Sequence, residues 1–408
     1  MNPQSQYLLV TVNYWAFTLT DGALRMLVLL YFYHIGFSPV EIALLFLFYE
    51  IFGIVTNFIG GWIGARSGLH ITMISGLALQ MLALLMLTVD QSWLTMAYVM
   101  CALAISGIAK DLNKMSAKSS VKCLASDKDG TLYKWVTLLT GSKNALKGLG
   151  FLIGAMLFEW FGFADALWLM VAWLVIAFIV AFIGLDNQLG KASNKPKFKE
   201  MFSPSAMVNW LSAARLFLFG ARDIWFAVAL PLYLQSALGW SYIAVGTYMA
   251  FWIIGYGLIQ ALTPKILRHR QNPNATTAAK LAFVLGLIPL LMSWQLINIQ
   301  AAEPLTSVTT NASLIIVIGL MIFGILFALN SSVHSYLIVS AANEDGASKE
   351  VGFYYMANAV GRLTGMMLSG YLYQDYGMEI CLLASAIFVM LSALLVWQAK
   401  PGRTESAI

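Results

Sequence analysis

Residues 185–205, LDNQLGKASNKPKFKEMFSPS, interrupt a chain that is otherwise dominated by apolar residues. The stretch is polar and basic, and it contains two prolines. Of the 408 residues, 60% are hydrophobic and only 11% are charged, whereas soluble domains have about 25% charged residues. A soluble fold is therefore excluded, and the stretch is interpreted as a solvated connection between two membrane-embedded halves.

The apolar runs on both sides of this stretch are long enough to cross a membrane, which takes about 20 residues per helix. They predict an all-α integral membrane protein with twelve transmembrane helices in two six-helix bundles. The bundles are 1–185 and 206–400, joined by a cytoplasmic basic linker at 186–205 and followed by a cytoplasmic tail at 401–408. The predicted crossings are residues 7–33, 40–65, 71–89, 93–118, 131–160, 163–184, 206–235, 241–263, 277–297, 313–339, 351–376 and 379–398.

The Lys and Arg residues predict the orientation, because cytoplasmic loops retain positive charge during insertion. If the N-terminus is cytoplasmic, the predicted outer connections contain no Lys or Arg, and the inner connections contain many. Both termini are therefore predicted to be cytoplasmic. The expected location is the bacterial inner (plasma) membrane, which the chain crosses several times.

Other protein classes find little support in the sequence. Cys101, Cys123 and Cys381 lack the spacing of a metal site or a disulfide framework, so no metal and no cofactor are predicted. An embedded enzyme should show a nucleophile, a metal cluster or a paired acid and base near one face, and a sensor should carry an output domain. An enzyme or a sensor is therefore a remote alternative to a transporter. The expected partners include membrane lipid and exclude nucleic acid.

The two halves resemble each other weakly. At an offset of 215 residues, Gly150 aligns with Gly365. TDGALR at 20–25 corresponds to FGARD at 219–223, and each places an acid and a base in mid-membrane. Parallel repeats of six helices are the arrangement of the major facilitator fold, with a site between the halves near the midplane. Chance similarity between glycine-rich apolar helices is the alternative.

Six cations lie inside predicted helices instead of at the cytoplasmic face. Each would cost roughly 2.5–3.5 kcal/mol at the centre of a lipid-facing helix, so these side chains must face protein or water. The counter-charges within helices are Asp21, Glu50 and Asp223, which leave the interior net positive. Such an interior attracts anions, and arginine suits phosphate or carboxylate groups. The six cations are Arg25, Lys143, Lys147, Arg215, Arg222 and Arg362.

Helical spacing groups these cations with other polar residues, because positions three, four or seven apart share a helix face. Asp21 and Arg25 are four residues apart, and a structural pair in which they neutralise each other is an equal alternative to a role in binding. The predicted substrate-binding residues are Arg25, Lys110, Lys114, Lys143, Lys147, Arg215, Arg222, Arg362, Tyr14, Asn330 and Asn358.

Four residues are candidates for proton coupling: Asp21, Glu50, Asp223 and His334. Histidine titrates near neutral pH, but a role for His334 as a hydrogen-bonding interior residue explains its position equally well. Glu50 has no basic partner nearby in sequence.

Four stretches carry a resemblance to a known family. They are NYWAFTLTDGALRMLV (13–28), SGIAKDLNKMSAKSS (106–120), LTGSKNALKG (139–148) and SAARLFLFGARDIWF (212–226). Together they resemble the ArsJ-type organoarsenical efflux permeases, a branch of the major facilitator superfamily. The resemblance extends through most of the chain, and the lysines of the second stretch are its distinctive part.

The resemblance implies a secondary active efflux transporter that exports 1-arseno-3-phosphoglycerate by alternating access. That anion forms when a glyceraldehyde-3-phosphate dehydrogenase uses arsenate instead of phosphate, so the family implies a functional partnership with this enzyme. Export followed by hydrolysis outside the cell gives arsenate resistance. The alternative is a transporter or antiporter of an ordinary phosphorylated organic anion or of phosphate, because a cationic cavity does not distinguish arsenate esters from phosphate esters.

Overall fold

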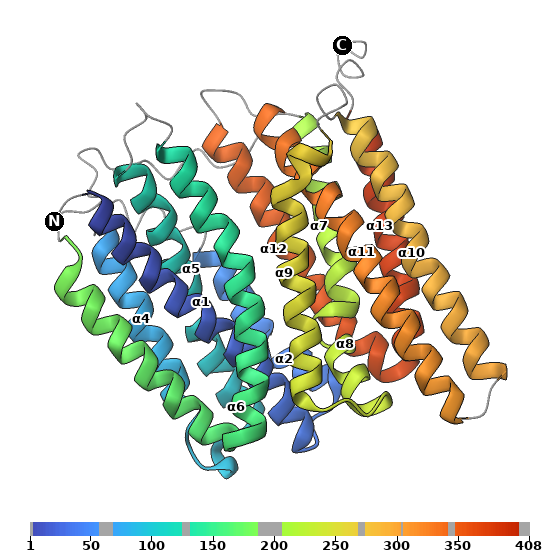
Figure 1. The fold of residues 1–408 in the computed structure, drawn as a ribbon, viewed down its shortest axis with the longest axis horizontal. Coiled ribbons are helices and arrows are strands. Elements are labelled where there is room, and N and C mark those ends of the chain that lie inside the picture. The colour runs from blue at the N-terminus through green and yellow to red at the C-terminus, as the bar shows by residue number, and fades with distance from the viewer. Residues whose placement is uncertain are drawn as a thin grey trace. The chain divides into compact units, whose positions relative to one another are not determined.

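The chain forms helices almost throughout the computed structural model (Figure 1). Every regular element within the described residues is helical. Residues 57–67, most of the predicted linker and the predicted C-terminal tail lie outside the described residues. The structure describes residues 3–56, 68–124, 131–186, 206–267, 274–302, 305–341 and 347–399.

The described helices lie in the segments in which the apolar runs predict crossings, and residues 57–65 of the second predicted crossing lie outside the described residues. In chain order, the elements before the predicted linker are α1 (Pro3–His34), α2 (Pro39–Leu45), whose apolar span extends to Thr56, α4 (Leu69–Met86), the short 3-10 helix η1 (Gln91–Trp93), α5 (Met96–Leu124) and α6 (Thr131–Gly184). The elements after it are α7 (Ala206–Phe226), α8 (Ala229–Leu232), the π-helical turn η3 (Tyr233–Ala237), α9 (Tyr242–Ile266), α10 (Ala275–Ala302), α11 (Leu305–Ala341), α12 (Ala347–Tyr376) and α13 (Met378–Gln398).

Nine helical segments of the described chain are long and apolar enough to cross a membrane. One of them includes both halves of α6, which breaks at Gly162, where φ is 75°. Glycine adopts this left-handed conformation without the penalty of a Cβ, so α6 covers two predicted crossings. The helices α5 and α12 are long enough but more polar. The count of twelve crossings and the cytoplasmic termini therefore stay predictions.

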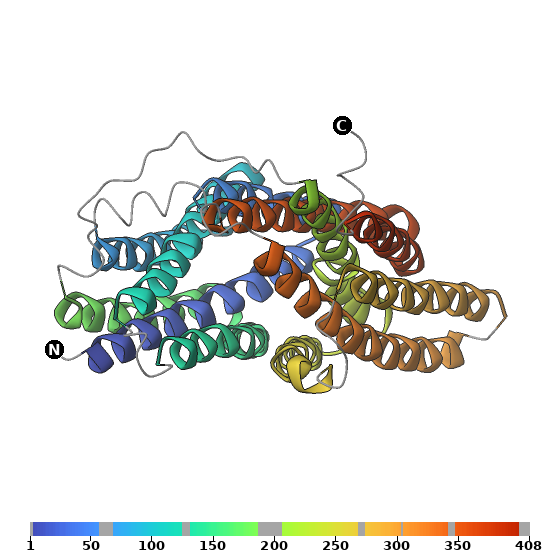
Figure 2. The ribbon, with the colours of Figure 1, turned by 90° about the horizontal axis from the view of Figure 1, so that it is seen from above.

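The chain divides into two compact units. Unit 1 contains Met1–Phe37, Leu44–Lys197 and Tyr242–Ile254, and unit 2 contains Ser38–Ala43, Phe198–Ser241 and Gly255–Ile408. Two short segments thus fall outside the predicted halves, because the first part of α9 packs on α6 and the first turn of α2 packs on α12. In unit 2, α10 also packs beside α11 and α13 (Figure 2).

Matching glycines bring helices together in both units. In unit 1, a Cβ on Gly22 of α1 would lie 3.2 Å from the Cα of Gly150 of α6. In unit 2, a Cβ on Gly365 of α12 would lie 3.0 Å from the Cα of Gly220 of α7. Small residues allow such close approach of helix backbones in membranes. The four glycines are those that the two halves of the sequence align, so the crossings support an internal repeat.

Candidate functional site

The charged side chains of unit 1 converge on Tyr49, which is 1% exposed. On α1, the guanidinium group of Arg25 forms an ion pair with Glu50. Its central carbon lies 4.5 Å from the centroid of the Tyr49 ring. The Tyr49 hydroxyl donates a hydrogen bond to Asp21. Tyr49 thus contacts both an acid and a base of α1.

The helix α5 adds three charges to this cluster. The ammonium nitrogen of Lys110 lies 3.9 Å from the centroid of the Tyr49 ring and 3.7 Å from a carboxylate oxygen of Asp111. Lys114 donates to the other carboxylate oxygen of Asp111 at 3.1 Å. A Cβ on Gly53 would lie 2.7 Å from the Asp111 carboxylate, so glycine at this position lets α5 approach closely.

The cluster around Tyr49 compensates its own charge. Arg25, Lys110 and Lys114 face the carboxylates of Asp21, Glu50 and Asp111, and the Glu50 and Asp111 side chains are 4% and 2% exposed. Buried carboxylates remain ionised only when they are paired and hydrogen-bonded.

This arrangement differs from the Asp21–Arg25 pair that helical spacing suggests for α1. Arg25 pairs with Glu50 of another helix, while Asp21 accepts a hydrogen bond from Tyr49. Glu50 therefore has a basic partner that is remote in sequence. Asp111 is a further intramembrane carboxylate that the sequence-based count of counter-charges omits, although its spacing from Lys114 indicates the pair.

The remaining candidates of unit 1 lie on α1 and α6. Tyr14 is buried on the face of α1 that carries Asp21. Lys143 and Lys147 are half-buried on α6, and the Lys147 ammonium group lies 5.6 Å from the centroid of the Phe151 ring.

In unit 2, Asp223 of α7 lies between two guanidinium groups. It accepts a hydrogen bond of 2.6 Å from Nε of Arg222 and one of 3.3 Å from Nε of Arg362 on α12. Aromatic rings surround Arg222, whose guanidinium carbon lies 5.2 Å from the centroid of Phe219 and 5.7 Å from that of Phe327. The Arg222 and Arg362 side chains are 15% and 23% exposed, so both remain accessible.

Arg215 of α7 is 5% exposed and forms no ion pair with any described residue. One of its terminal nitrogens donates to the backbone carbonyl of Ser331 on α11 at 3.0 Å. Its guanidinium carbon lies 3.9 Å from the centroid of the Phe219 ring. Within the described residues of α7 and α12, Asp223 thus contacts two guanidinium groups, and Arg215 adds a third cation that has no carboxylate partner there.

Three further polar candidates lie on α11 and α12. Asn330 and His334 are fully buried and occupy one face of α11. Within the described chain, neither side chain has a hydrogen-bond partner, and the side-chain oxygen of Asn358 on α12 also has none. Sequence reasoning missed the aromatic residues, although Phe219 lies four residues after Arg215 and three before Arg222, which places all three on one face.

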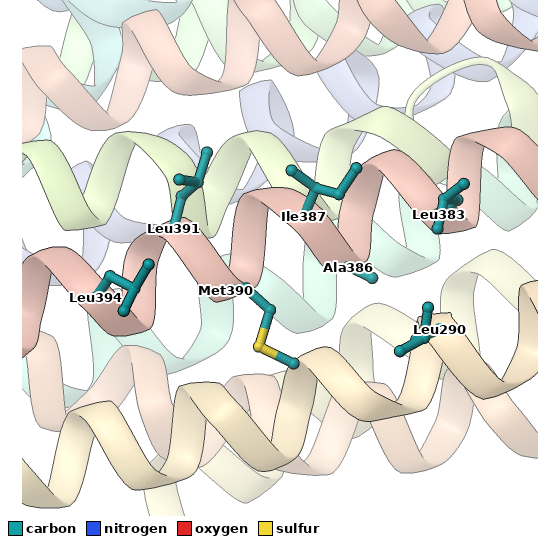
Figure 3. A pocket seen from close by; sticks show the side chains of 7 residues that line it. All are labelled: Leu290, Leu383, Ala386, Ile387, Met390, Leu391 and Leu394. Atoms are coloured by element: carbon teal, nitrogen blue, oxygen red, sulfur yellow. The ribbon is translucent and has the colours of Figure 1, made fainter.

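The described residues contain no group of three or more His, Cys, Asp or Glu side chains that could hold a metal ion. A groove between α10 and α13 is lined entirely by apolar side chains, among them Leu290, Ile387 and Met390 (Figure 3). It offers no charge or hydrogen bond to an anion, so the charged clusters are the better candidates for a substrate site.

Comparison with known proteins identifies the family. The family model of the Major Facilitator Superfamily matches residues 7–302. The chain belongs to the major facilitator superfamily. As a major facilitator it is a multi-pass membrane protein, and family and fold point to a secondary transporter instead of an enzyme. No curated protein sequence matches the chain.

Solved structures of similar fold extend over nearly the whole chain. A POT family transporter in complex with 5-aminolevulinic acid has a TM-score of 0.74 and 13% sequence identity, covering 98% of this chain and 99% of that one. A mutant of the peptide transporter POT in complex with sulfate has a TM-score of 0.72 and 13% identity, covering 97% of this chain and 94% of that one. At this identity the likeness concerns the fold alone.

Proposed function

We propose that this major facilitator exports an anionic organoarsenical, 1-arseno-3-phosphoglycerate, by alternating access and so gives arsenate resistance. The supporting observation is the charge of the described part of unit 2, where Arg222 and Arg362 both contact Asp223 and Arg215 forms no ion pair with a described residue. Fixed cations in a low-dielectric interior attract anions. The positive charge of these side chains supports a negatively charged substrate, and the resemblance to the ArsJ-type permeases suggests which anion it is. The partnership with a dehydrogenase and the location in a bacterial inner membrane belong to the same proposal.

Arg222 and Arg362 are the proposed primary ligands of the substrate. Both are partly exposed, and each uses Nε to contact Asp223. A guanidinium group has five N–H donors in a planar fork, so each arginine keeps donors for a phosphate, arsenate or carboxylate group. The carboxylate of Asp223 contacts both guanidinium groups and so keeps them close to each other.

Glu50 and Asp223 are the proposed coupling acids, with Asp21 and His334 as further candidates. An anion that binds Arg25 or Arg222 competes with the carboxylate already paired to that arginine. Protonation of the displaced carboxylate would remove its charge and couple transport to a proton gradient. Transport into vesicles that does not respond to an imposed pH gradient would contradict this coupling.

Arsenate resistance tests the function. Cells that express the chain with a glyceraldehyde-3-phosphate dehydrogenase should survive arsenate, and Arg222→Ala should abolish the protection at unchanged expression. Lys280→Ala is the matched control, because Lys280 is exposed on α10. Full resistance in cells with Arg222→Ala would refute the assigned anion site.

Exchange of an ordinary phosphorylated organic anion or of phosphate is the second candidate. The guanidinium and ammonium groups of both units recognise charge and oxygen geometry, which arsenate and phosphate esters share. Counterflow of 3-phosphoglycerate or phosphate in reconstituted vesicles, at rates that match the arseno compound, would favour this second function.

A further inference from the structure

Two guanidinium groups of unit 2 contact the same aromatic ring, that of Phe219. The guanidinium carbons of Arg215 and Arg222 lie 3.9 Å and 5.2 Å from the centroid of the Phe219 ring. The ring attracts both cations, so it holds two like charges near each other. The two arginines differ in their partners, because Arg222 is paired with Asp223, whereas the contacts of Arg215 within the described chain are with a backbone carbonyl and aromatic rings.

Two fully buried polar side chains belong to the segment of α11 that Arg215 contacts. Ser331, whose carbonyl accepts a hydrogen bond from Arg215, follows Asn330 directly and precedes His334 by one turn of α11. His334 is close enough to Arg215 to interact with its charge. Neither the amide of Asn330 nor the imidazole of His334 has a hydrogen-bond partner in the described chain.

This lack of partners has a cost. A buried polar group without a partner destabilises the protein, because it has lost its hydrogen bonds to water. The inner nitrogen of Arg215, Nε, is also buried without an acceptor. The guanidinium group of Arg215, the amide of Asn330 and the imidazole of His334 thus all have unused hydrogen-bonding capacity. N–H groups of these three kinds donate hydrogen bonds to oxyanions, so together they could form an oxyanion-binding site.

We propose that Arg215, Asn330 and His334 form a second subsite, which binds the far oxyanion of a substrate whose near oxyanion is held by Arg222 and Arg362. The inference rests on the proposed function, since it takes unit 2 as the anion-binding part of the transporter. The substrate class is a short, flexible acid with an oxyanion at each end. Arg215 exchanges the Ser331 carbonyl for the substrate, and Phe219 sets the spacing between the two subsites.

The two subsites predict a difference between single oxyanions and two-ended anions. Inorganic phosphate fills only the Arg222–Arg362 subsite, whereas 3-phosphoglycerate, with a phosphate and a carboxylate, fills both. Binding of both probes to the purified full-length protein is measured by isothermal titration calorimetry. Because a hydrogen bond to a charged group contributes about 1.5–3 kcal/mol, Arg215→Gln should weaken 3-phosphoglycerate at least about tenfold. The same variant should leave the affinity for phosphate unchanged.

Asn330→Leu separates a binding role from a structural role. Leucine has the same number and branching of side-chain heavy atoms as asparagine and removes an amide without partners in the described chain, so the melting temperature of the ligand-free variant should be equal to or above that of the wild type. Its affinity for 3-phosphoglycerate should fall, and its affinity for phosphate should not. His334→Gln, which keeps an N–H donor, should retain more of the affinity for 3-phosphoglycerate than His334→Leu.

Other outcomes overturn the subsite or the proposed function separately. Equal weakening of both probes by Arg215→Gln, or unchanged 3-phosphoglycerate binding in Asn330→Leu, would overturn the subsite and leave the proposed function intact. Arg222→Gln should weaken both probes, and failure to do so would overturn the primary anion site. If neither probe binds the wild-type protein, the anion site and the subsite are both wrong.

Discussion

Glu50 should be essential to the stability of unit 1, and Glu50→Gln tests this with a minimal change of shape. The substitution removes one negative charge from a cluster in which three cations face three carboxylates. Arg25 then loses its ion-pair partner while 83% of its side chain stays covered, since that side chain is 17% exposed. The expected result is an uncompensated charge in the protein interior.

The size of the effect follows from burial. Removal of one partner from a buried ion pair typically costs about 3–5 kcal/mol. Arg25 keeps its attraction to Asp21 and its position over the Tyr49 ring, so the lower end of the range is expected, about 3 kcal/mol. The double variant Arg25→Met/Glu50→Gln removes both charges and should cost less than the sum of the single variants, with a coupling energy of about 2–3 kcal/mol.

Equilibrium unfolding in mixed micelles, followed by tryptophan fluorescence, measures these free energies. Asp165→Asn is the matched control, because Asp165 is an exposed carboxylate of unit 1 and such substitutions change stability by less than about 0.5 kcal/mol. If Glu50→Gln unfolds at the same denaturant concentration as this control, the ion pair does not stabilise unit 1. Additive single-variant effects would likewise refute the pairing.

Three further substitutions, and a fourth as a control, test packing and hydrogen bonding by the same unfolding measurement. Gly365→Ala should destabilise the protein, because the new Cβ would lie 3.0 Å from the Cβ of Asp223. Gly255→Ala is the control: its Cβ would have open space around it, so this substitution should be neutral or stabilising by up to about 1 kcal/mol. Equal effects of the two substitutions would contradict the close helix crossing. Tyr49→Phe leaves Asp21 without its hydroxyl donor and should cost about 1–3 kcal/mol, so wild-type stability would exclude this hydrogen bond. Ser369→Ala removes the hydroxyl that accepts hydrogen bonds from two backbone N–H groups at the start of α8, and it should also lower the free energy of unfolding by about 1–3 kcal/mol. Unchanged stability would mean that these N–H groups find another acceptor.

Much of the fold follows from the sequence, because membrane helices depend on local composition. Apolar runs of sufficient length predict the positions of the helices, and Gly162 lies at the break between two predicted crossings. The sequence repeat also aligns the glycines at which α1 meets α6 and α7 meets α12. The polar helices α5 and α12 are harder to assign as crossings, since their charges lower the hydropathy on which such a prediction depends.

The candidate site could be predicted only in part. Charge content identifies Arg25, Arg215 and Arg222 as interior cations, since lipid excludes them. Their partners depend on contacts between helices that are remote in sequence, which is why the ion pair of Arg25 with Glu50 could not be derived from spacing. Phe219 was missed for a different reason, because an aromatic residue in a membrane helix is ordinary and only its distances to two guanidinium groups distinguish it.

The two units differ in charge at one aligned position, which is basic in unit 1 and acidic in unit 2. The alignment of the glycines at the helix crossings places Arg25 of α1 at the position of Asp223 of α7, and Lys147 of α6 at that of Arg362 of α12. In unit 2 these positions carry opposite charges and form an ion pair. In unit 1 both positions carry positive charges, and Arg25 instead forms an ion pair with Glu50, which lies outside α1 and α6.

The consequence concerns the anion. Unit 1 brings in Glu50 and Asp111 and thereby neutralises the charges around Tyr49. In the described part of unit 2, Arg222 and Arg362 contact the same carboxylate between two helices, and Arg215 forms no ion pair. Because the backbone crossings are equivalent, the difference arises from side-chain charge. If the proposed function holds, an anion should gain most from the α7–α12 pair, where Arg222 and Arg362 contact the same carboxylate.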